Sequence, residues 1–319
     1  MPEDPFVAHD VPDLINTLPV LFGFKPEDSV VAIATHGPRH RMRFRMRLDL
    51  PGPEQVEDVA AFVVRHLRRN DAEGAILLAV TDDAEMAGEV VWAIENRLGD
   101  ILPVVSAWAD GERYWTTLDD CDPDGYPYEA TDHHESVVRA VAAGQEILPS
   151  RDALAAKLDP FGGERRRWLD GGSATVAGQV LAVLRARGDL PVEEVALAAA
   201  HAGRSLTDDQ ALRLAWWAVV SPTRGALWEL ITPSSAPLMV GMWSQVSRCA
   251  PRAIRAPSLT LAGFASWLSG DGAFALIAVE KALDADPDFP MAATMLEVLE
   301  RGIPPSTWRP LGSGEQASA

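Results

Sequence analysis

The sequence predicts an α/β domain with a mixed sheet, followed by an all-helical region, and three observations carry that prediction. Up to residue 118, segments whose apolar residues repeat as in a strand are followed by segments in which they repeat as in a helix, in the order β-β-α-β-α-β-β. From residue 131 onward the helical period dominates. The segment FGGERRRWLDGGSA, near residues 160–172, has the glycine content of a linker. We therefore place the α/β domain at residues 12–160 and the helical region at residues 161–303.

The α/β domain is predicted to begin with an antiparallel hairpin. Residues 1–11 are expected to form a flexible arm, and a short helix over residues 12–21 is limited by Pro19. Residues 30–35 are almost entirely apolar, which is typical of a buried strand. Residues 41–50 alternate between apolar and charged side chains, and a period of two is the signature of a strand.

The rest of the domain alternates between helices and strands. A helix, a strand, a second helix and two further strands are predicted at residues 54–69, 75–80, 84–98, 101–108 and 112–118. Strand–helix–strand units predict parallel pairing with right-handed crossovers, and both helices lie on one face of the sheet if both crossovers step the same way. Two of these strands are apolar on both faces, so helices after residue 131 are expected to cover the second face.

Paired helices are expected throughout the C-terminal region. Helical periodicity is found at residues 137–148, 151–158, 164–187, 191–202, 207–220, 223–231, 236–249, 258–269, 273–285 and 290–301. Residues 259–287 resemble one tetratricopeptide-type unit, with matches at Gly263, Ala275, Ala282 and Pro287 and departures at Leu259 and Ser266. This pattern favours a stacked helix pair over a repeat array. Residues 304–319 are expected to be a disordered tail.

Composition limits which binding partners and which cellular compartment are expected. The net charge of -18 and the pI near 4.7 disfavour nucleic acid and anionic membranes as partners. No apolar run is long enough to span a membrane, and the acidic start is unlike a targeting segment. Cys121 and Cys249 are far apart and form no disulfide framework. We therefore expect a cytoplasmic protein.

The segment LPVLFGFKPEDSVV, followed by an alternating strand that ends in RLDLP, is the most distinctive in the chain. It carries a pattern at Gly23, Phe24, Pro26, Asp28 and Ser29, closed by Asp49-Leu50-Pro51, with further matches at Tyr114, Trp115, Cys121, Pro123 and Gly125. On these residues the sequence resembles an uncharacterised, mainly actinobacterial family, domain of unknown function 4192. Family members often carry paired cysteines where this chain has CDPDG. The resemblance implies no known activity and no cofactor.

Three carboxylates follow the predicted ends of strands, where open α/β sheets bind ligands. Asp49, Asp82 and Asp83 can bind Mg²⁺ there or supply the general base of a hydrolase or transferase. The alternative is that Asp82 and Asp83 cap the following helix. No phosphate-binding loop GxxxxGK[ST], GxGxxG after a strand, GxSxG or HExxH motif is present, which lowers the expectation of the common nucleotide-binding and hydrolase classes.

A stripe of arginines on the second strand is the candidate for binding a ligand or partner. Arg41, Arg43, Arg45 and Arg47 are spaced by two and are expected to line one face. Guanidinium groups in this arrangement can hold an acidic partner or a phosphorylated ligand. The alternatives are a guard against edge-to-edge sheet pairing, and pairing with the protein's own surplus of carboxylates.

The acidic loop over residues 119–132 offers a metal hypothesis. Asp120, Asp122 and Asp124 spell the first half of a calcium loop, but Thr131 stands where a bidentate Glu is needed. Cys121 with His133 and His134 offers three zinc-type ligands, which lack the short paired spacings of structural zinc sites. A solvated acidic turn is therefore favoured, and no metal is expected.

Three functions stay open from the sequence. The leading one is a non-catalytic interaction or regulatory module, because tryptophans on paired helices, such as Trp217, Trp243 and Trp267, suit grooves for a protein or peptide partner as well as a core. The second is a hydrolase or transferase that acts at the strand ends. The third is a small-ligand sensor in a cleft between the two halves.

Overall fold

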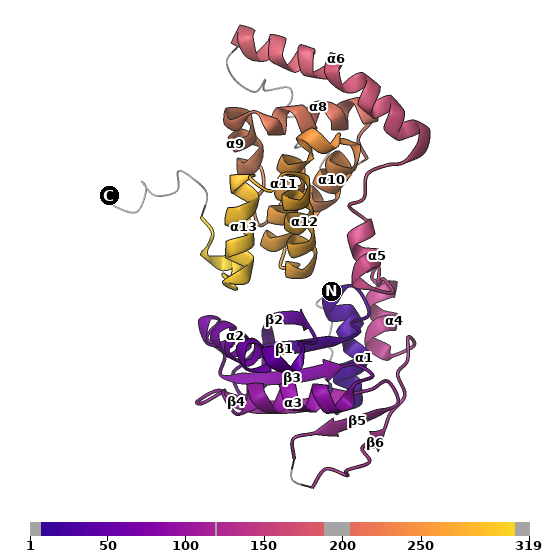
Figure 1. The fold of residues 1–319 in the computed structure, drawn as a ribbon, viewed down its shortest axis with the longest axis vertical. Helices are drawn as coiled ribbons and strands as arrows, with labels where there is room; N and C mark the ends of the chain where they lie inside the picture. Colours follow the sequence, from indigo (N-terminus) through magenta and orange to yellow (C-terminus); the bar gives the residue numbers. More distant parts are fainter. Residues whose placement is uncertain (1–7, 119, 188–204, 310–319) are drawn as a thin grey trace, which may run out of the picture. The chain divides into compact units, whose positions relative to one another are not determined.

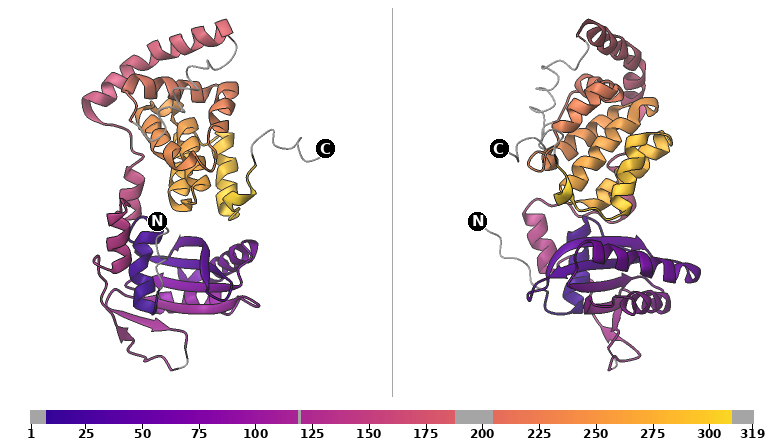
Figure 2. Two further views of the ribbon diagram at one scale, coloured as in Figure 1. Left: turned by 180° about the vertical axis from the view of Figure 1, so that it is seen from behind. Right: turned by 90° about the vertical axis from the view of Figure 1, so that its left-hand side faces the viewer.

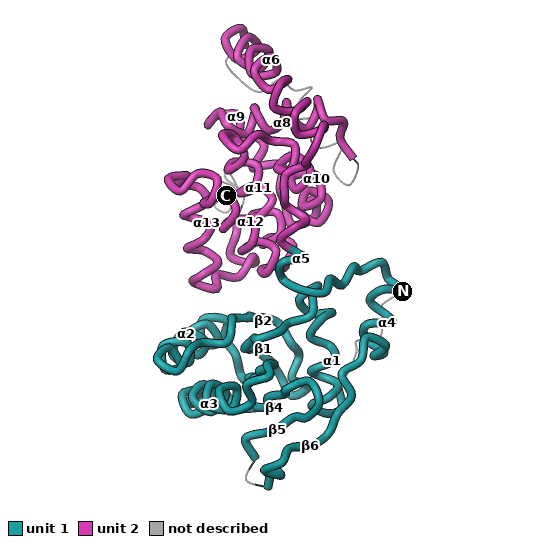
Figure 3. Tube along the Cα trace, turned by 45° about the vertical axis from the view of Figure 1, so that its right-hand side comes forward, with its two compact units in different colours: residues 1–154 teal, residues 155–319 magenta. Residues whose placement is uncertain are grey.

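The computed structural model describes residues 8–118, 120–187 and 205–309, which belong to two compact units (Figure 1). Unit 1 spans residues 1–154 and unit 2 spans residues 155–319 (Figure 3). This division lies shortly before the boundary expected at residue 160. Unit 1 holds a mixed sheet with helices, and unit 2 is helical, so the predicted succession of an α/β part and an all-α part is confirmed.

Among the described residues, unit 1 forms one six-stranded sheet in the spatial order β2-β1-β3-β4-β5-β6. The chain order is α1 (Val11–Phe22), β1 (Ser29–His36), β2 (Arg41–Asp49), η1 (Pro53–Gln55), α2 (Val56–Arg69), β3 (Gly74–Val80), α3 (Ala84–Glu95), β4 (Leu102–Ala109), β5 (Arg113–Thr116), β6 (Tyr126–Pro127), α4 (Glu135–Ala142) and α5 (Arg151–Ala156). The predicted order β-β-α-β-α-β-β is thus confirmed. The short β6 is new, because we expected residues 119–132 to form only a loop.

The strand pairing differs from the prediction in one place. β1 pairs antiparallel with both β2 and β3, and parallel pairing joins β3 to β4. β2 and β3 therefore run in the same direction but are not neighbours, because β1 lies between them. The apolar character of β1 explains this order. All its residues from Ser29 to Thr35 are buried, as a central strand requires, whereas the charged β2 takes the edge.

Different helices cover the two faces of the sheet. α2 and α3 cover one face, where they form a buried cluster with Val30, Ala32 and Ala34 of β1 and alternate residues of β3. α1 and α4 pack on each other and lie on the other side of the sheet (Figure 2). A helix after residue 131 thus contributes to the second cover, as expected, but α1 shares that role.

The prediction that Pro19 limits the first helix is wrong. Pro19 lies inside α1, and the helix continues to Phe22. A proline within a helix removes one backbone hydrogen bond, but the turn around it buries Ile15, Leu18 and Phe22, which offsets the loss. Gly23 ends the helix instead. Its φ of 73° lies in the left-handed region, and its N–H donates to the Pro19 carbonyl at 2.9 Å.

The arginine stripe of β2 does not lie on one face. The register of β1 and β2 shifts between Ala34 and Thr35, which marks a β-bulge. On one side of the bulge Arg45 and Arg47 lie opposite Ile33 and Val31, and on the other side Arg41 lies opposite His36. Residues that lie opposite each other share a face, so the bulge moves Arg41 to the face of α2 and α3 and leaves Arg43 without a partner in the β1–β2 register.

Unit 2 consists of successive helices that pack against their neighbours. They are α6 (Gly163–Arg187), α8 (Asp208–Val219), α9 (Ser221–Glu229), α10 (Ala236–Cys249), η2 (Arg252–Ile254), α11 (Arg255–Leu268), α12 (Gly272–Ala285), α13 (Pro290–Glu300) and η3 (Pro305–Thr307). The predicted linker near residues 160–172 is wrong, because α6 runs through it. Leu169, Ser173, Val176 and Val180 recur at helical spacing and are buried, and α6 packs against α8.

The stacked helix pair predicted at residues 259–287 is confirmed as α11 and α12. Gly263 lies at their contact, where a β-carbon would approach the Val279 side chain to 2.9 Å and the Ala275 carbonyl to 3.2 Å. Close packing of the two helices therefore requires a glycine there. Two of the tryptophans considered as groove residues, Trp217 and Trp243, are fully buried, so they belong to the core.

Some predicted segments lie partly or wholly outside the described residues. These are most of the arm at residues 1–11, the helix at 191–202 and the end of the tail. Within the part of the tail that the structure describes, which was expected to be disordered, Pro305–Thr307 form η3, and Trp308 lies against Phe264 with ring centroids 5.8 Å apart. None of the helices within the described ranges combines the length and the apolar character that a membrane crossing requires.

Candidate functional site

The candidate site is a pocket of about 420 Å³ in unit 1, at the carboxyl ends of β3 and β4. Open α/β sheets bind ligands at this edge, and a pocket of this size accommodates a small molecule. Its walls come from α1, the loop before β1, the ends of β3 and β4, and the loop before α4. The lining residues are Ile15, Asn16, Leu18, Pro19, Lys25, Pro26, Glu27, Asp28, Val80, Thr81, Asp82, Asp110, Gly111, Tyr128, Ala130, Thr131 and Asp132.

One wall is the segment Gly23–Ser29, which carries the pattern found in the sequence. Phe24 is 1% exposed and forms a bridge to Leu148, so it anchors the segment. Asp28 has a φ of 41°, an uncommon conformation for a residue with a side chain. Its carboxylate accepts a hydrogen bond of 2.7 Å from the hydroxyl of Thr81, at the end of β3. The segment therefore joins α1 to the strand edge and places Asp28 in the pocket wall.

Ser29, the last residue of that pattern, has a structural role. It is fully buried, and its hydroxyl accepts a hydrogen bond of 2.8 Å from Nε of Arg47. Arg47 also forms an ion pair with Asp49 and donates to the Glu27 carbonyl at 3.3 Å. Because its side chain is only 12% exposed, Arg47 ties β2 to the loop before β1 and is not available to a partner.

The structure separates the three carboxylates that the sequence placed at strand ends. Asp49 is paired with Arg47 and does not line the pocket. Asp83 caps α3, where its carboxylate accepts a hydrogen bond of 3.0 Å from the Met86 N–H. Asp82 alone of the three lines the pocket. The helix-capping alternative is therefore correct for Asp83, and a joint site of all three residues is not formed.

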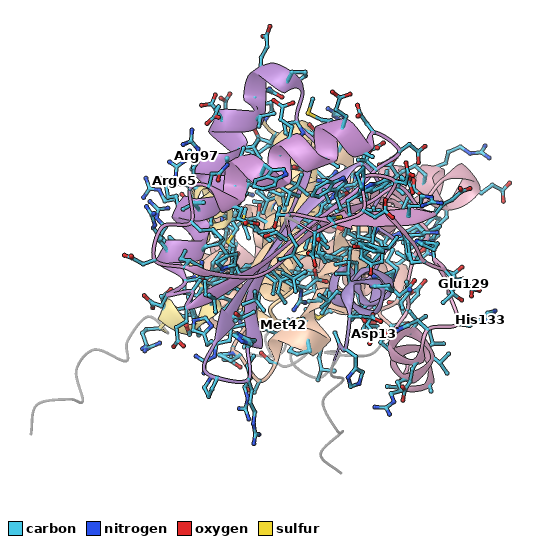
Figure 4. All side chains as sticks on the ribbon, turned by 90° about the horizontal axis from the view of Figure 1, so that it is seen from below. Asp13, Met42, Arg65, Arg97, Glu129 and His133 are labelled. Carbon is cyan, nitrogen blue, oxygen red and sulfur yellow. The ribbon has the colours of Figure 1, made fainter. Side chains whose placement is uncertain are left out.

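The opposite wall is the loop before α4, which Asn16 of α1 holds in place. The buried Asn16 side chain donates to the Glu129 carbonyl and accepts from the Thr131 N–H, both at 3.0 Å. Figure 4 shows Glu129 on the same side of unit 1 as Asp13, one turn before Asn16 in α1. A single amide thus satisfies two backbone groups of this loop and fixes it against α1.

A second set of hydrogen bonds joins α1 to α4 behind this wall. His134 lies 3.1 Å from the Asp13 carboxylate and 2.8 Å from the Ser136 hydroxyl, which contacts Thr17 at 3.1 Å. Ser136 is 5% exposed, so the set holds two helices together and does not present a nucleophile. The His9 backbone N–H and then His134 lower the pKa of the Asp13 carboxyl, against an opposing effect of burial.

The turn between β4 and β5 forms the floor at the far side. Asp110 accepts hydrogen bonds from the backbone N–H groups of Glu112 and Arg113, at 2.9 and 2.7 Å, and Gly111 adopts a φ of 99°. The neighbouring Tyr128 is half-buried. Burial, and secondarily the charge of Asp110, raise the pKa of its phenol. Tyr128 therefore stays neutral in the physiological range and can donate a hydrogen bond.

The pocket is strongly acidic. Its five carboxylates, Glu27, Asp28, Asp82, Asp110 and Asp132, and the single amine of Lys25 leave a formal charge of −4. Within the described part of the chain, the side chains of Glu27, Asp82 and Asp132 have no hydrogen-bond or ion-pair partner. These groups are therefore available to a ligand, and the ligand that they favour is a cation.

The residues considered for metal binding lie apart from this pocket. No group of three or more His, Cys, Asp or Glu side chains within the described ranges could hold a metal ion. In the acidic turn, Asp122 accepts from the backbone N–H of Asp124, and the Asp120 carbonyl accepts from Tyr126. Cys121 accepts from the Thr116 N–H, and neither it nor His134 meets the other. The acidic turn is thus stabilised by its own hydrogen bonds.

Several pocket residues had no signal in the sequence. Asn16 and Tyr128 belong to no motif, and only the fold brings them together with Lys25 and Asp110. Asp110 follows β4, which runs parallel to β3. The rule that ligands bind at the carboxyl ends of parallel strands, which selected Asp82, therefore also applies to Asp110. This rule is the signal by which Asp110 could have been predicted.

Comparison with known protein families matches residues 12–306 to one described as a domain of unknown function, DUF4192. The match covers most of both units, so the chain belongs to this family. No curated protein and no solved structure matches the chain.

Proposed function

We propose that this member of the DUF4192 family is a non-catalytic binding module, and that its unit 1 pocket takes a small molecule with a positively charged amine or guanidinium group. The observation that carries the proposal is the set of carboxylates without partners that line this pocket, Glu27, Asp82 and Asp132. An ammonium or guanidinium group would offset their mutual repulsion and form charge-assisted hydrogen bonds. Phosphorylated or acidic ligands are disfavoured by the same charge.

The conformation of Asp28 supports the same site. A non-glycine residue in the left-handed region costs of order 1 kcal/mol or more, and such residues cluster at ligand-binding sites. Here the conformation turns the Asp28 carboxylate toward Thr81 and into the pocket wall. The apolar side chains of Ile15, Leu18 and Val80 supply surface for the carbon skeleton of the ligand.

The proposal places the ligand within unit 1 and takes the compartment to be the cytoplasm. Cys121 and Cys249 are both free thiols, which suits a reducing environment. The hypothesis of a peptide groove lined by tryptophans loses support, because Trp217 and Trp243 are buried in the core of unit 2.

Isothermal titration of the full-length protein with agmatine, lysine and spermidine tests this function, with glutarate as an anionic control. We expect Asp82→Asn to weaken binding of the amine at least tenfold, because one charge-assisted hydrogen bond contributes about 1.5–3 kcal/mol. Asp83→Asn is the matched control. It removes the same charge one residue away, keeps the helix cap because Asn caps as well as Asp, and leaves affinity unchanged.

Two results would contradict the proposal. One is that the wild-type protein binds none of the three amines. The other is that Asp82→Asn and Asp83→Asn weaken binding equally, which would mean that the general negative field of the protein attracts the amine and that the pocket has no part in it.

A further inference from the structure

A groove on the other side of unit 1 is as basic as the pocket is acidic. It has a volume of about 680 Å³ and lies between α2 and the end of α3. Arg65, Arg68 and Arg69 come from one side of α2, and Arg97 follows α3. Figure 4 shows Arg65 and Arg97 next to each other at the edge of the unit. Four arginines thus meet in one groove of a chain whose net charge is -18.

The spacing of these arginines follows from the helix. Residues three and four apart lie on the same side of an α-helix, so Arg65, Arg68 and Arg69 must project together. The opposite side of α2 is buried through Ala60, Val63 and Leu67, which fixes the rotation of the helix and turns the arginines to solvent. The groove therefore results from the amphipathic packing of α2 against the sheet.

One arginine is held in position by the backbone. The guanidinium of Arg68 donates to the carbonyls of Arg97 and Leu98, at 3.3 and 3.5 Å. These bonds join α2 to the end of α3 and fix the Arg68 guanidinium beside Arg97. Arg97 forms an ion pair with Glu57, which lies in the first turn of α2. Arg68 and Arg97 are thus held in place before any ligand arrives, which reduces the entropic cost of binding.

A purely structural explanation is that the arginines neutralise nearby negative charge. The count of charges shows that this explanation is insufficient. Each helix C-terminus is equivalent to about −0.5 charge. Two such termini, of α2 and α3, together with Glu57, balance about two positive charges. Even if Arg69 is left out of the count, Arg65, Arg68 and Arg97 leave a positive surplus of about one charge.

We propose that this groove binds a phosphate group, either as the free ion or on a small organic molecule. The planar fork of arginine matches a phosphate with two parallel hydrogen bonds, and several guanidiniums can share its oxygens. Asn96 at the rim adds an amide donor. The groove is independent of the acidic pocket, so a single ligand that carries both an amine and a phosphate is not required.

Titration of the full-length protein with inorganic phosphate, pyrophosphate and adenosine monophosphate tests the site. We expect saturable binding that weakens as salt is added, and a Kd at least tenfold higher in Arg65→Gln and in Arg97→Gln. Arg43→Gln is the matched control. It removes one exposed arginine from β2, outside the groove, and is expected to leave the Kd unchanged.

The three probes separate the sources of the phosphate. Tighter binding of adenosine monophosphate than of inorganic phosphate assigns the site to an organic phosphate, and equal binding assigns it to the free ion. The proposal is overturned if the wild-type protein binds none of the probes at low salt. It is also overturned if Arg43→Gln weakens binding as much as Arg65→Gln, provided that circular dichroism shows each variant folded.

Discussion

The two charged sites of unit 1 lie at opposite ends of the same sheet. The acidic pocket lies where β3 and β4 end, and the arginine groove lies where α2 and α3 end, before the chain enters β3 and β4. The two sites are also built differently. Three of the four groove arginines come from a single helical turn and a half, whereas the pocket draws on segments from Ile15 to Asp132. The arginines of α2 are therefore placed together by the helix alone, and only Arg97 depends on a distant contact, whereas the whole pocket depends on long-range contacts.

The substitution Phe24→Ala removes the side chain that anchors one wall of the pocket, and it is expected to have the largest effect on stability. Phe24 is 1% exposed at the base of the segment that carries Asp28, and truncation of a buried phenylalanine costs about 3–5 kcal/mol. Amide hydrogen exchange of β1 and β3 measures this loss within unit 1, where whole-chain unfolding would mix two units. Amine binding should be lost with it.

Phe62→Ala is the matched control for this effect. Phe62 lies on α2 beside the groove, is half-buried, and contacts Arg65 with its guanidinium 5.7 Å from the ring centroid. A contact of this kind contributes about 0.5–1 kcal/mol, so the substitution should cost much less than Phe24→Ala. Equal destabilisation by the two substitutions would mean that Phe24 does not anchor the pocket wall.

The substitution Asn16→Ala is expected to have an intermediate effect and to separate the two sites. It leaves the Glu129 carbonyl and the Thr131 N–H without their partner, at a cost of about 1–3 kcal/mol. Because the loop before α4 then loosens, amine affinity should fall, whereas phosphate affinity at the groove should not change. Titration of the one variant with both ligands measures this difference.

Gln145→Ala serves as the control for Asn16. Gln145 also donates to a backbone carbonyl of α1, that of Val20 at 2.7 Å, but it is exposed. Exposed substitutions of this kind change stability by about 0.5 kcal/mol or less. If Asn16→Ala affects both ligands, or affects neither, the view that the pocket alone depends on distant contacts is wrong.

The order of elements in unit 1 could be read from the sequence because each element carries its own period. Residues 41–50 alternate, and residues 54–69 repeat as a helix does. The spatial order of the strands could not be read in this way. Nothing local says that β1 lies between β2 and β3, and the bulge that divides the arginines appears only when Thr35 and Met42 are paired. The prediction for Pro19 was wrong because the burial of its neighbours offsets the free-energy cost of the backbone hydrogen bond that the proline removes.

The candidate site shows the same limit. The segment Gly23–Ser29 was recognised by its pattern, and the structure places Asp28 in the pocket, but the partner of Asp28 is Thr81, far along the chain. Asp82 and Asp83 are equivalent in the sequence. Only the start of α3 distinguishes the cap from the pocket residue. Three of the four groove arginines, by contrast, can be recognised from RHLRR on a predicted helix, because their proximity is local.

The pH dependence of the contact between α1 and α4 is the smallest expected effect. The His9 N–H and His134 lower the pKa of the Asp13 carboxyl in the folded protein. A lowered pKa means that Asp13 stabilises the fold above its unfolded pKa of about 3.9, and that this contribution disappears as the pH falls through the folded value. Asp13→Asn should therefore be less stable than the wild type at pH 7, and the difference should shrink as the pH is lowered from 7 to about 3. Hydrogen exchange of α1 amides at both pH values measures it. A difference that stays constant between them would mean that the charge of Asp13 has no part in holding α1 to α4, and the wall behind the pocket would then depend on Asn16 alone.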